Sequence, residues 1–166
     1  MFKYEFVDKG HKRRMKPPKD TLPPNTIRRD KWDAVPPKVF NFGINHPVSN
    51  ILVDNSGTEP CSTEAECTKI IKDLQTNHMT VHDMPDIKQN FLIGGDGNLY
   101  VARGWVSDAA LTGEHKERLT DTLYFSYFGP KGRQPTDIEL NTFNQVMDIG
   151  KNNEFIVENP KIHLEL

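Results

Sequence analysis

The sequence predicts an α/β fold in which a central mixed β-sheet is flanked by α-helices, and three observations lead to this prediction. Two stretches begin with the residue spacing of a helix cap and continue with apolar residues at helical spacing. Several shorter apolar stretches are bounded by turn formers, which is typical of strands. Strand-like and helix-like stretches alternate along the chain, and this order suits a mixed sheet covered by helices.

The first predicted strand covers residues 50–54, NILVD, an apolar run bounded by polar residues. A helix is predicted next, over about residues 62–78. Thr63 and Glu66 have the spacing of a capping box there, and the apolar residues that follow recur at helical intervals. This part of the chain therefore predicts a buried strand followed by an amphipathic helix.

The remaining elements follow the same logic. Strands at about 90–94 and 98–102 meet across Gly-Asp-Gly, a strong hairpin signal. The aromatic run at 122–129 predicts an inner strand that is buried on both faces. A second capping box opens a helix over about 136–150, which ends at a glycine. Alternating apolar residues predict a last strand over 161–166.

Residues 1–25 are expected to form a basic, proline-rich flexible leader, and residues 26–166 the folded domain. Residues 1–31 hold ten Lys and Arg against four Asp and Glu, a net charge of +6, which leaves −8 for the rest of a chain whose total is −2. Such a run can contact nucleic acid, anionic lipid or a nuclear import receptor. No aromatic platform accompanies it, so we favour a solvated leader and expect no nucleic-acid partner.

Composition excludes a membrane span. Apolar residues make up 36% of the chain and charged residues 27%, mean hydropathy is −0.64, and no apolar run approaches the length of a transmembrane helix. The first residues are charged and never reach the apolar core of an export signal. If this chain is the complete product, a cytoplasmic location is expected.

Cys61 and Cys67 are the two cysteines of the sequence. Two cysteines alone do not make a structural zinc site, and five intervening residues make a poor redox motif. A disulfide across the start of the predicted helix and a pair of buried thiols both remain possible on the residues alone.

Several separated motifs resemble one family. They read PVSNILVDNSGTEPCSTEAEC, IIKDLQTNHM, DIKQNFLIGGDGNLYVARGW and TLYFSYFG, and a preceding IRRDKWDAVPP extends the match over about residues 26–166. They resemble the peptidoglycan recognition proteins of animal innate immunity, which share the fold of N-acetylmuramoyl-L-alanine amidases. The resemblance implies a disulfide between Cys61 and Cys67 and an extracellular setting. It also implies that the family's usual C-terminal end is missing after residue 166.

The family's enzymes bind zinc through two histidines and a thiolate, with a tyrosine as helper. The resemblance places Asp54, Gln89 and Glu165 at three of those positions, and the thiolate position lies beyond the sequence. A substitute site of Asp54, His163 and Glu165 would be rich in carboxylates and would lack the thiolate. We therefore expect no catalytic residues, no metal, no cofactor and no amidase activity.

The resemblance also suggests a ligand groove, although Asp83-Met84 stands where receptors of diaminopimelate-type peptidoglycan carry Gly-Trp. Its candidate residues are Asn55, Ser56, His78, Arg103 and Trp105. For His78 a structural role at the helix end is favoured, where a partial positive charge is stabilised, whereas Arg103 and Trp105 suit groove and packing roles equally. The resemblance implies partners among receptor paralogues of the family, a second copy, or peptidoglycan fragments. The leading hypothesis is a non-catalytic modulator of immune signalling, and the alternative is a direct muropeptide receptor.

Overall fold

The computed structural model describes residues 5–9, 12–16, 21–40, 43–110 and 118–166 of the chain. Parts of the expected leader, including Pro17 and Pro18, lie outside these described residues. In chain order the elements are β1 Glu5–Lys9, β2 Lys12–Lys16, β3 Thr26–Ile27, β4 Val48–Asn55, α1 Glu64–Thr80, β5 Phe91–Ile93, β6 Leu99–Val101, β7 Ala109–Ala110, β8 Arg118–Leu119, β9 Thr122–Tyr127, α2 Asp137–Asn152 and β10 Ile156–Glu165.

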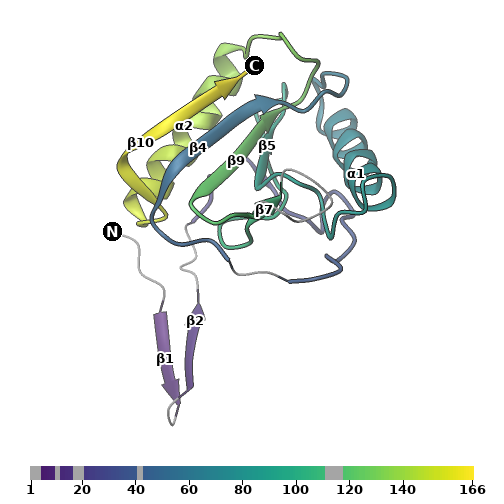
Figure 1. The fold of residues 1–166 in the computed structure, drawn as a ribbon. Helices are drawn as coiled ribbons and strands as arrows, with labels where there is room; N and C mark the ends of the chain where they lie inside the picture. Colours follow the sequence, from purple (N-terminus) through teal and green to yellow (C-terminus); the bar gives the residue numbers. More distant parts are fainter. Residues whose placement is uncertain (1–4, 10–11, 17–20, 41–42, 111–117) are drawn as a thin grey trace.

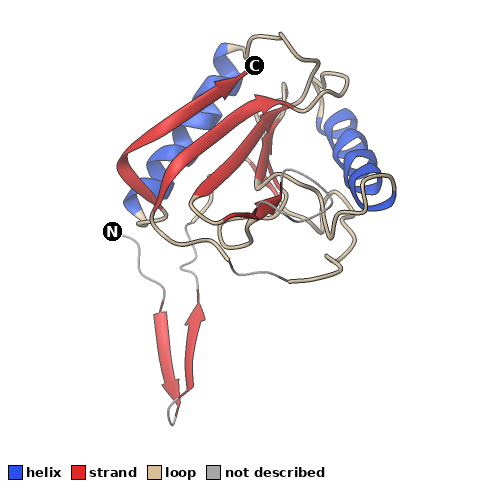
Figure 2. Cartoon of the chain, viewed as in Figure 1, coloured by secondary structure: helices blue, strands red, loops and turns tan. Residues whose placement is uncertain are grey.

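A six-stranded sheet in the order β10-β4-β9-β5-β6-β3 forms the centre of the fold (Figure 1). The pairs β10–β4, β4–β9, β9–β5 and β6–β3 are parallel, and β5–β6 is an antiparallel hairpin. The sheet is therefore mixed, as predicted. Figure 2 shows the two helices set apart around this sheet, with α2 behind β10 and β4.

Two apolar clusters hold the helices to opposite faces of the sheet. On one face, Phe143 and Val146 of α2 belong to the same buried cluster as Val53 and Phe125. On the other face, the α1 residues Ile71 and Leu74 belong to a second cluster with Leu92 and Phe128. Because side chains alternate across a strand, neighbouring residues of β5 and β6 belong to different clusters: Phe91 and Leu99 to the first, and Leu92 and Tyr100 to the second.

Both helices begin where the capping signals indicated. Thr63 caps α1 by accepting a hydrogen bond from the Glu66 N–H, and Thr136 and Glu139 form a complete capping box before α2. Each helix runs two residues further than predicted, to Thr80 and Asn152. A frayed last turn has no sharp sequence signal, so such ends are the least predictable part of a helix.

The structure contains strands that the sequence analysis missed. β3, β7 and β8 have two residues each, too short for an alternation pattern, and β10 begins five residues before the predicted start. Within the expected flexible leader, β1 and β2 pair antiparallel as a separate two-stranded sheet. Their sequences, EFVDK and KRRMK, are mostly charged, so a search for apolar runs overlooks them. Among the described residues, no helix is long and apolar enough to cross a membrane.

Candidate functional site

A polar cluster lies on the sheet face opposite α2, where β4 and β9 run side by side. Asp54 of β4 is the register partner of Ser126 of β9, and the two neighbouring residues Val53 and Phe125 point to the α2 side. Tyr124 shares the face of Ser126, two positions along the same strand. In the view of Figure 1, α2 lies behind the sheet and this polar face of β4 and β9 is turned toward the reader.

Hydrogen bonds within the protein hold the Asp54 carboxylate. Its Oδ2 accepts a hydrogen bond of 2.5 Å from the Tyr124 hydroxyl, and its Oδ1 accepts one from the Ser126 hydroxyl. The Gln89 Nε2 donates in turn to Ser126 Oγ at 3.1 Å. Gln89 and Ser126 are completely buried, and Tyr124 is nearly so. Asp54, at the position that the resemblance assigns to a zinc ligand, is thus already hydrogen-bonded by two neighbours, Tyr124 and Ser126.

Burial and hydrogen bonding act against each other at Asp54. Burial raises the pKa of its carboxyl above the ordinary value of 3.8, while the hydroxyls of Ser126 and Tyr124 and the charges of Lys88 and Lys131 oppose the rise. The pKa of the Tyr124 hydroxyl is also raised, first by burial and then by the Asp54 charge, so Tyr124 stays protonated as a donor. Lys88 lies over the Tyr124 ring, with its Nζ 5.6 Å from the ring centroid.

The other two members of the substitute zinc site considered in the sequence, His163 and Glu165, lie on the neighbouring strand β10. Glu165 of β10 is the register partner of Asp54, so the two carboxylates occupy adjacent strands on one face. His163 is displaced from them, because its Nε2 lies 3.1 Å from Asn50 Oδ1. Among the described residues, no group of three or more His, Cys, Asp or Glu side chains is arranged to hold a metal. Zinc sites are built mainly from imidazole and thiolate, so the hydroxyl and amide groups around Asp54 do not fit a zinc ion.

Two of the predicted groove residues lie at the end of β4. Asn55 points to the α2 side, opposite Asp54, and is 2% exposed. Its Nδ2 donates to the carbonyls of Arg133 and Leu166 at 2.9 and 3.2 Å, so it fastens the end of β10 to the loop before α2. Ser56 is half-buried in the following loop, and its hydroxyl lies 2.7 Å from that of Thr58.

His78 occupies the last turn of α1 and is 6% exposed. Its Nδ1 accepts a hydrogen bond of 3.1 Å from the Lys88 backbone N–H. Burial, helped by the charges of Lys88, His82 and Arg103, lowers the pKa of His78 from 6.5 to about 3. The imidazole is therefore neutral at physiological pH, contrary to the expected partial positive charge, because loss of water outweighs the attraction of the helix end.

Arg103 and Trp105 support the loop after β6. The Arg103 Nε donates to the Ile87 carbonyl at 2.6 Å and its Nη1 to the Asp108 carbonyl at 2.8 Å. The Trp105 ring is 7% exposed, stacks on Phe155 at a centroid distance of 4.6 Å, and donates from Nε1 to the Thr21 carbonyl at 2.9 Å. These contacts favour the packing role over the groove role for both residues. A groove formed by Asn55, Ser56, His78, Arg103 and Trp105 stays a prediction.

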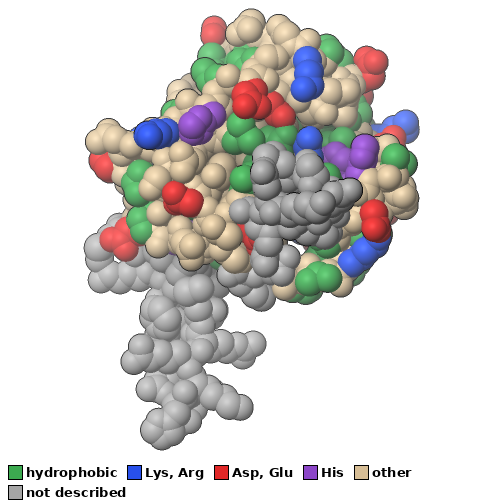
Figure 3. All heavy atoms as spheres, viewed as in Figure 1, with side chains coloured by type: hydrophobic (Ala, Val, Ile, Leu, Met, Phe, Trp, Pro, Cys, Tyr) green, Lys and Arg blue, Asp and Glu red, His purple; other side chains and the backbone are tan. Residues whose placement is uncertain are grey.

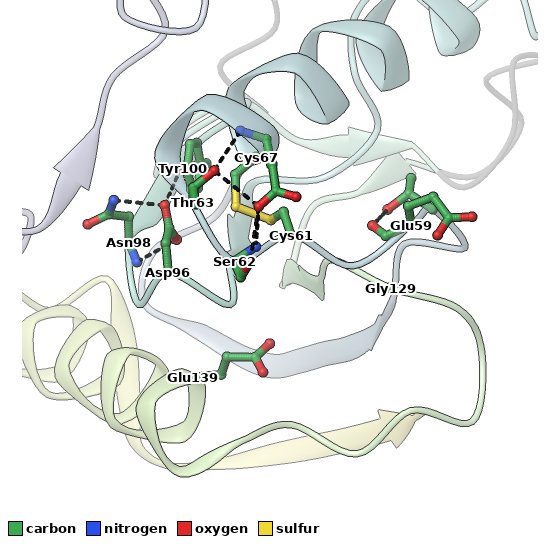
Figure 4. Close-up of a disulfide and its surroundings, with 12 residues drawn as sticks. Glu59, Cys61, Ser62, Thr63, Cys67, Asp96, Asn98, Tyr100, Gly129 and Glu139 are labelled. Atoms are coloured by element: carbon green, nitrogen blue, oxygen red, sulfur yellow. Dashed lines mark hydrogen bonds between the residues drawn. A yellow bond between two sulfur atoms is a disulfide. The ribbon is translucent and has the colours of Figure 1, made fainter.

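Cys61 and Cys67 form the disulfide that the resemblance implied, across the start of α1 (Figure 4). Next to it, the Asp96 carboxylate accepts hydrogen bonds from the Tyr100 hydroxyl at 2.5 Å and the Asn98 side chain at 2.9 Å. Gly95 lies so close to Cys61 that an added Cβ would be 2.1 Å from the Cys61 carbonyl oxygen. The β5–β6 turn thus packs directly against the disulfide loop and requires glycine there.

Sequence reasoning missed three members of the polar cluster: Lys88, Tyr124 and Ser126. Tyr124 and Ser126 alternate within a strand that was correctly predicted, but only the register with β4 brings them to Asp54, and register is not visible in one sequence. Figure 3 shows this face of the molecule with acidic and basic side chains scattered singly over its described part.

The sequence of the chain is similar to those of known proteins of one family. It is 34% identical over 128 residues to peptidoglycan-recognition protein LC of Drosophila melanogaster, a match that covers 75% of this chain and 24% of that protein. The chain spans about a quarter to two thirds of the length of the first curated relatives that it matches. No protein-family model matches the chain.

Solved structures agree with this assignment. The ectodomain of the Drosophila transmembrane receptor PGRP-LCa superposes with a TM-score of 0.76 at 31% identity, covering 82% of each chain. A complex of peptidoglycan recognition protein-LE with tracheal cytotoxin gives a TM-score of 0.78 at 27% identity, covering 85% of this chain and 82% of that one. The fold, the disulfide and these likenesses agree with the sequence motifs. The chain belongs to the peptidoglycan recognition protein family.

Proposed function

We propose that this chain is a non-catalytic peptidoglycan recognition protein that modulates innate immune signalling, mainly through contacts with other proteins. The observation that carries this proposal is that the Asp54 carboxylate is already hydrogen-bonded to neighbouring side chains. Tyr124 and Ser126 hold both oxygens of the Asp54 carboxylate, and Gln89 donates to Ser126. A residue engaged in this way does not present a free ligand to a catalytic metal.

The replaced tyrosine position supports the same conclusion. An amidase needs a group that orients water or stabilises the developing oxyanion. Gln89 is completely buried, and its amide nitrogen donates a hydrogen bond to Ser126. The Tyr124 hydroxyl supplies no substitute, because it donates to Asp54 and its pKa is raised.

Direct binding of peptidoglycan fragments is the second candidate function. It is favoured by the related PGRP-LE, whose solved structure contains tracheal cytotoxin, a monomeric diaminopimelic acid-type peptidoglycan. In this chain a muropeptide would meet Ser56 and Lys88 at the edges of the polar face, whereas Asn55, Arg103 and Trp105 are engaged in internal contacts. Only part of a typical groove is thus available to a ligand.

A pull-down distinguishes the two functions. The purified chain is mixed with insoluble peptidoglycan of the lysine and diaminopimelate types, and separately with immobilised ectodomains of receptor members of the family. We expect no retention on either peptidoglycan and retention on at least one ectodomain, with circular dichroism as the control for folding. Retention on peptidoglycan that Lys88→Glu abolishes and Lys131→Glu preserves would favour the receptor function. No retention on any ectodomain would contradict the proposal.

A further inference from the structure

The last strand forms an open edge of the sheet. β10 stands first in the strand order and pairs with β4 on one side, and among the described residues no strand pairs with its other side. Figure 1 shows β10 along the outer border of the sheet. Its residues Lys161–Glu165 are all exposed. Unpaired backbone groups along such an edge are a template for another strand.

An apolar surface continues from this edge on the α2 side. Ile162 and Leu164 point to that side, because their register partners are Ile51 and Val53 of the apolar core. Their exposed fractions are 47% and 65%. They line a cavity of about 360 Å³ together with Leu140 of α2 and other residues of that face. Charged side chains usually protect an edge strand, so the pattern of charge along β10 decides what can pair there.

The charges along β10 are complementary to those of a second, antiparallel copy of the same strand. If a second copy pairs antiparallel with the two-fold axis at His163, Lys161 lies opposite Glu165 of the second copy, and Ile162 lies opposite its Leu164. By the two-fold symmetry, the Lys161–Glu165 pair and the Ile162–Leu164 pair each occur twice. A parallel alignment in register would instead set Lys161 beside Lys161 and Glu165 beside Glu165. Closed two-fold dimers require the antiparallel arrangement.

We propose that β10 is a self-association surface, on which two copies of this chain pair antiparallel about His163 and join their sheets into one. This inference rests on the proposed protein-contact function, whose surface and partner it names. The Lys161–Glu165 pairs select the register, and Ile162 and Leu164 bury apolar area against the second copy. Pro160 lacks a backbone N–H and limits the pairing segment to the residues that follow it.

Exchanged charges test the register. In Lys161→Glu, two carboxylates face each other at both ends of the paired segment, and in Glu165→Lys two ammonium groups do. Each variant alone is expected to associate at least about tenfold more weakly than the wild type in sedimentation equilibrium. An equimolar mixture of the two variants restores both opposite-charge pairs, and so does the double variant in one chain. Both are expected to recover dimer, with a dependence on salt.

A crosslink tests the position of the axis. Cys61 and Cys67 are bonded to each other, so the His163→Cys variant adds the only free thiol of the sequence. Residues directly opposite in an antiparallel pair lie close enough for a disulfide. His163→Cys is expected to form a covalent dimer under mild oxidation. Glu158→Cys, outside the paired segment, serves as the matched control, which is expected to associate like the wild type but to form no covalent crosslink.

The results separate this inference from the proposed function. A wild-type chain that stays monomeric up to the highest soluble concentration, or single charge variants that associate as the wild type does, would overturn the self-pairing. If such a chain still binds a receptor ectodomain, the protein-contact function stands and only the partner is wrong. Dimers that follow the charge exchange, in a chain that binds no ectodomain, would support the self-pairing and contradict signalling through receptor paralogues.

Discussion

The polar cluster around Asp54 is built from residues of two neighbouring strands, β4 and β9. A carboxylate in this position is held by two hydroxyls, Tyr124 and Ser126, which alternate along β9 and so reach it from the same face. Lys88 adds a positive charge nearby. Both oxygens of the Asp54 carboxylate accept a hydrogen bond within the cluster, and such networks rigidify a fold.

The pH dependence of stability tests this cluster. The pKa of Asp54 is raised above 3.8 in the folded state, so the folded chain keeps this proton at pH values where the unfolded chain has released it. Ionising the buried carboxyl costs stability as the pH rises through the folded pKa. Compared with Asp54→Asn, the free energy of unfolding of the wild type is expected to fall as the pH is raised above about 3.8. The free energies of unfolding of the two proteins are compared in denaturant titrations at several pH values. A wild-type free energy that stays constant or grows relative to that of Asp54→Asn as the pH rises would contradict this description.

The titration of His78 changes the free energy of unfolding with pH in the opposite direction. The pKa of His78 in the folded chain is about 3, below the ordinary value of 6.5. Between these two pH values the imidazole is therefore protonated in the unfolded chain and neutral in the folded chain. Stability that is present above pH 6.5 is lost as the pH falls, with a slope of at most about 1.4 kcal/mol per pH unit from this group. His78→Gln is expected to remove that slope. An NMR titration in which the His78 imidazole becomes protonated near pH 6 would contradict this account of its burial.

Residue identity was easier to predict than residue placement. The resemblance selected Asp54, Gln89 and Glu165, and the structure finds Asp54 and Glu165 paired on adjacent strands. It also selected Asn55, the next residue, which alternation sends to the other face of the sheet. Arg103 and Trp105 have chemistry that suits a ligand or a core, and only their contacts with Ile87, Asp108 and Phe155 distinguish these roles.

Among the elements, α1 depends on both its cap and its disulfide. Thr63 caps the helix between the two cysteines, and the Cys61–Cys67 bond closes a loop with a sequence separation of six. A loop of this length restricts the unfolded chain enough to contribute about 2 kcal/mol of stability. The sequence alone left disulfide and free thiols open, because the spacing permits both.

The disulfide prediction follows from this loop. Cys61→Ser combined with Cys67→Ser is expected to lower the free energy of unfolding by about 2 kcal/mol in urea titrations. The fold is expected to survive, because the apolar clusters on both faces of the sheet remain. Ser62→Ala, an exposed neighbour of the same loop, serves as the control with a smaller effect. An unchanged midpoint in the double variant would show that the bond adds no stability.

Helices and strands could be predicted from the sequence where the pattern of apolar residues extended over many positions. Both helices were found from their capping boxes, and the aromatic strand β9 is buried from Leu123 onward, as its composition indicated. The two-residue strands gave no periodic signal, and β1 and β2 were hidden by their charges. Strand order and register came only from the three-dimensional structure, since they depend on contacts between distant segments.

At the scale of the whole molecule, one mixed sheet with a helix on each face carries two separate surfaces. The polar face holds Asp54 and Gln89, the residues that the sequence motifs align with the family's catalytic positions. The outer edge of β10 and the apolar surface beside it offer a place for another strand. The family assignment rests on the whole fold, whereas function depends on these two local surfaces.

Zinc content is the measurement that tests the non-catalytic account most directly. The purified chain is dialysed against zinc, and the bound metal is measured together with release of the stem peptide from a muropeptide. We predict far less than stoichiometric zinc, no peptide release, and no change in either on Asp54→Ala. Stoichiometric zinc that Asp54→Ala removes, accompanied by peptide release, would contradict the account and identify the polar cluster as a working amidase centre.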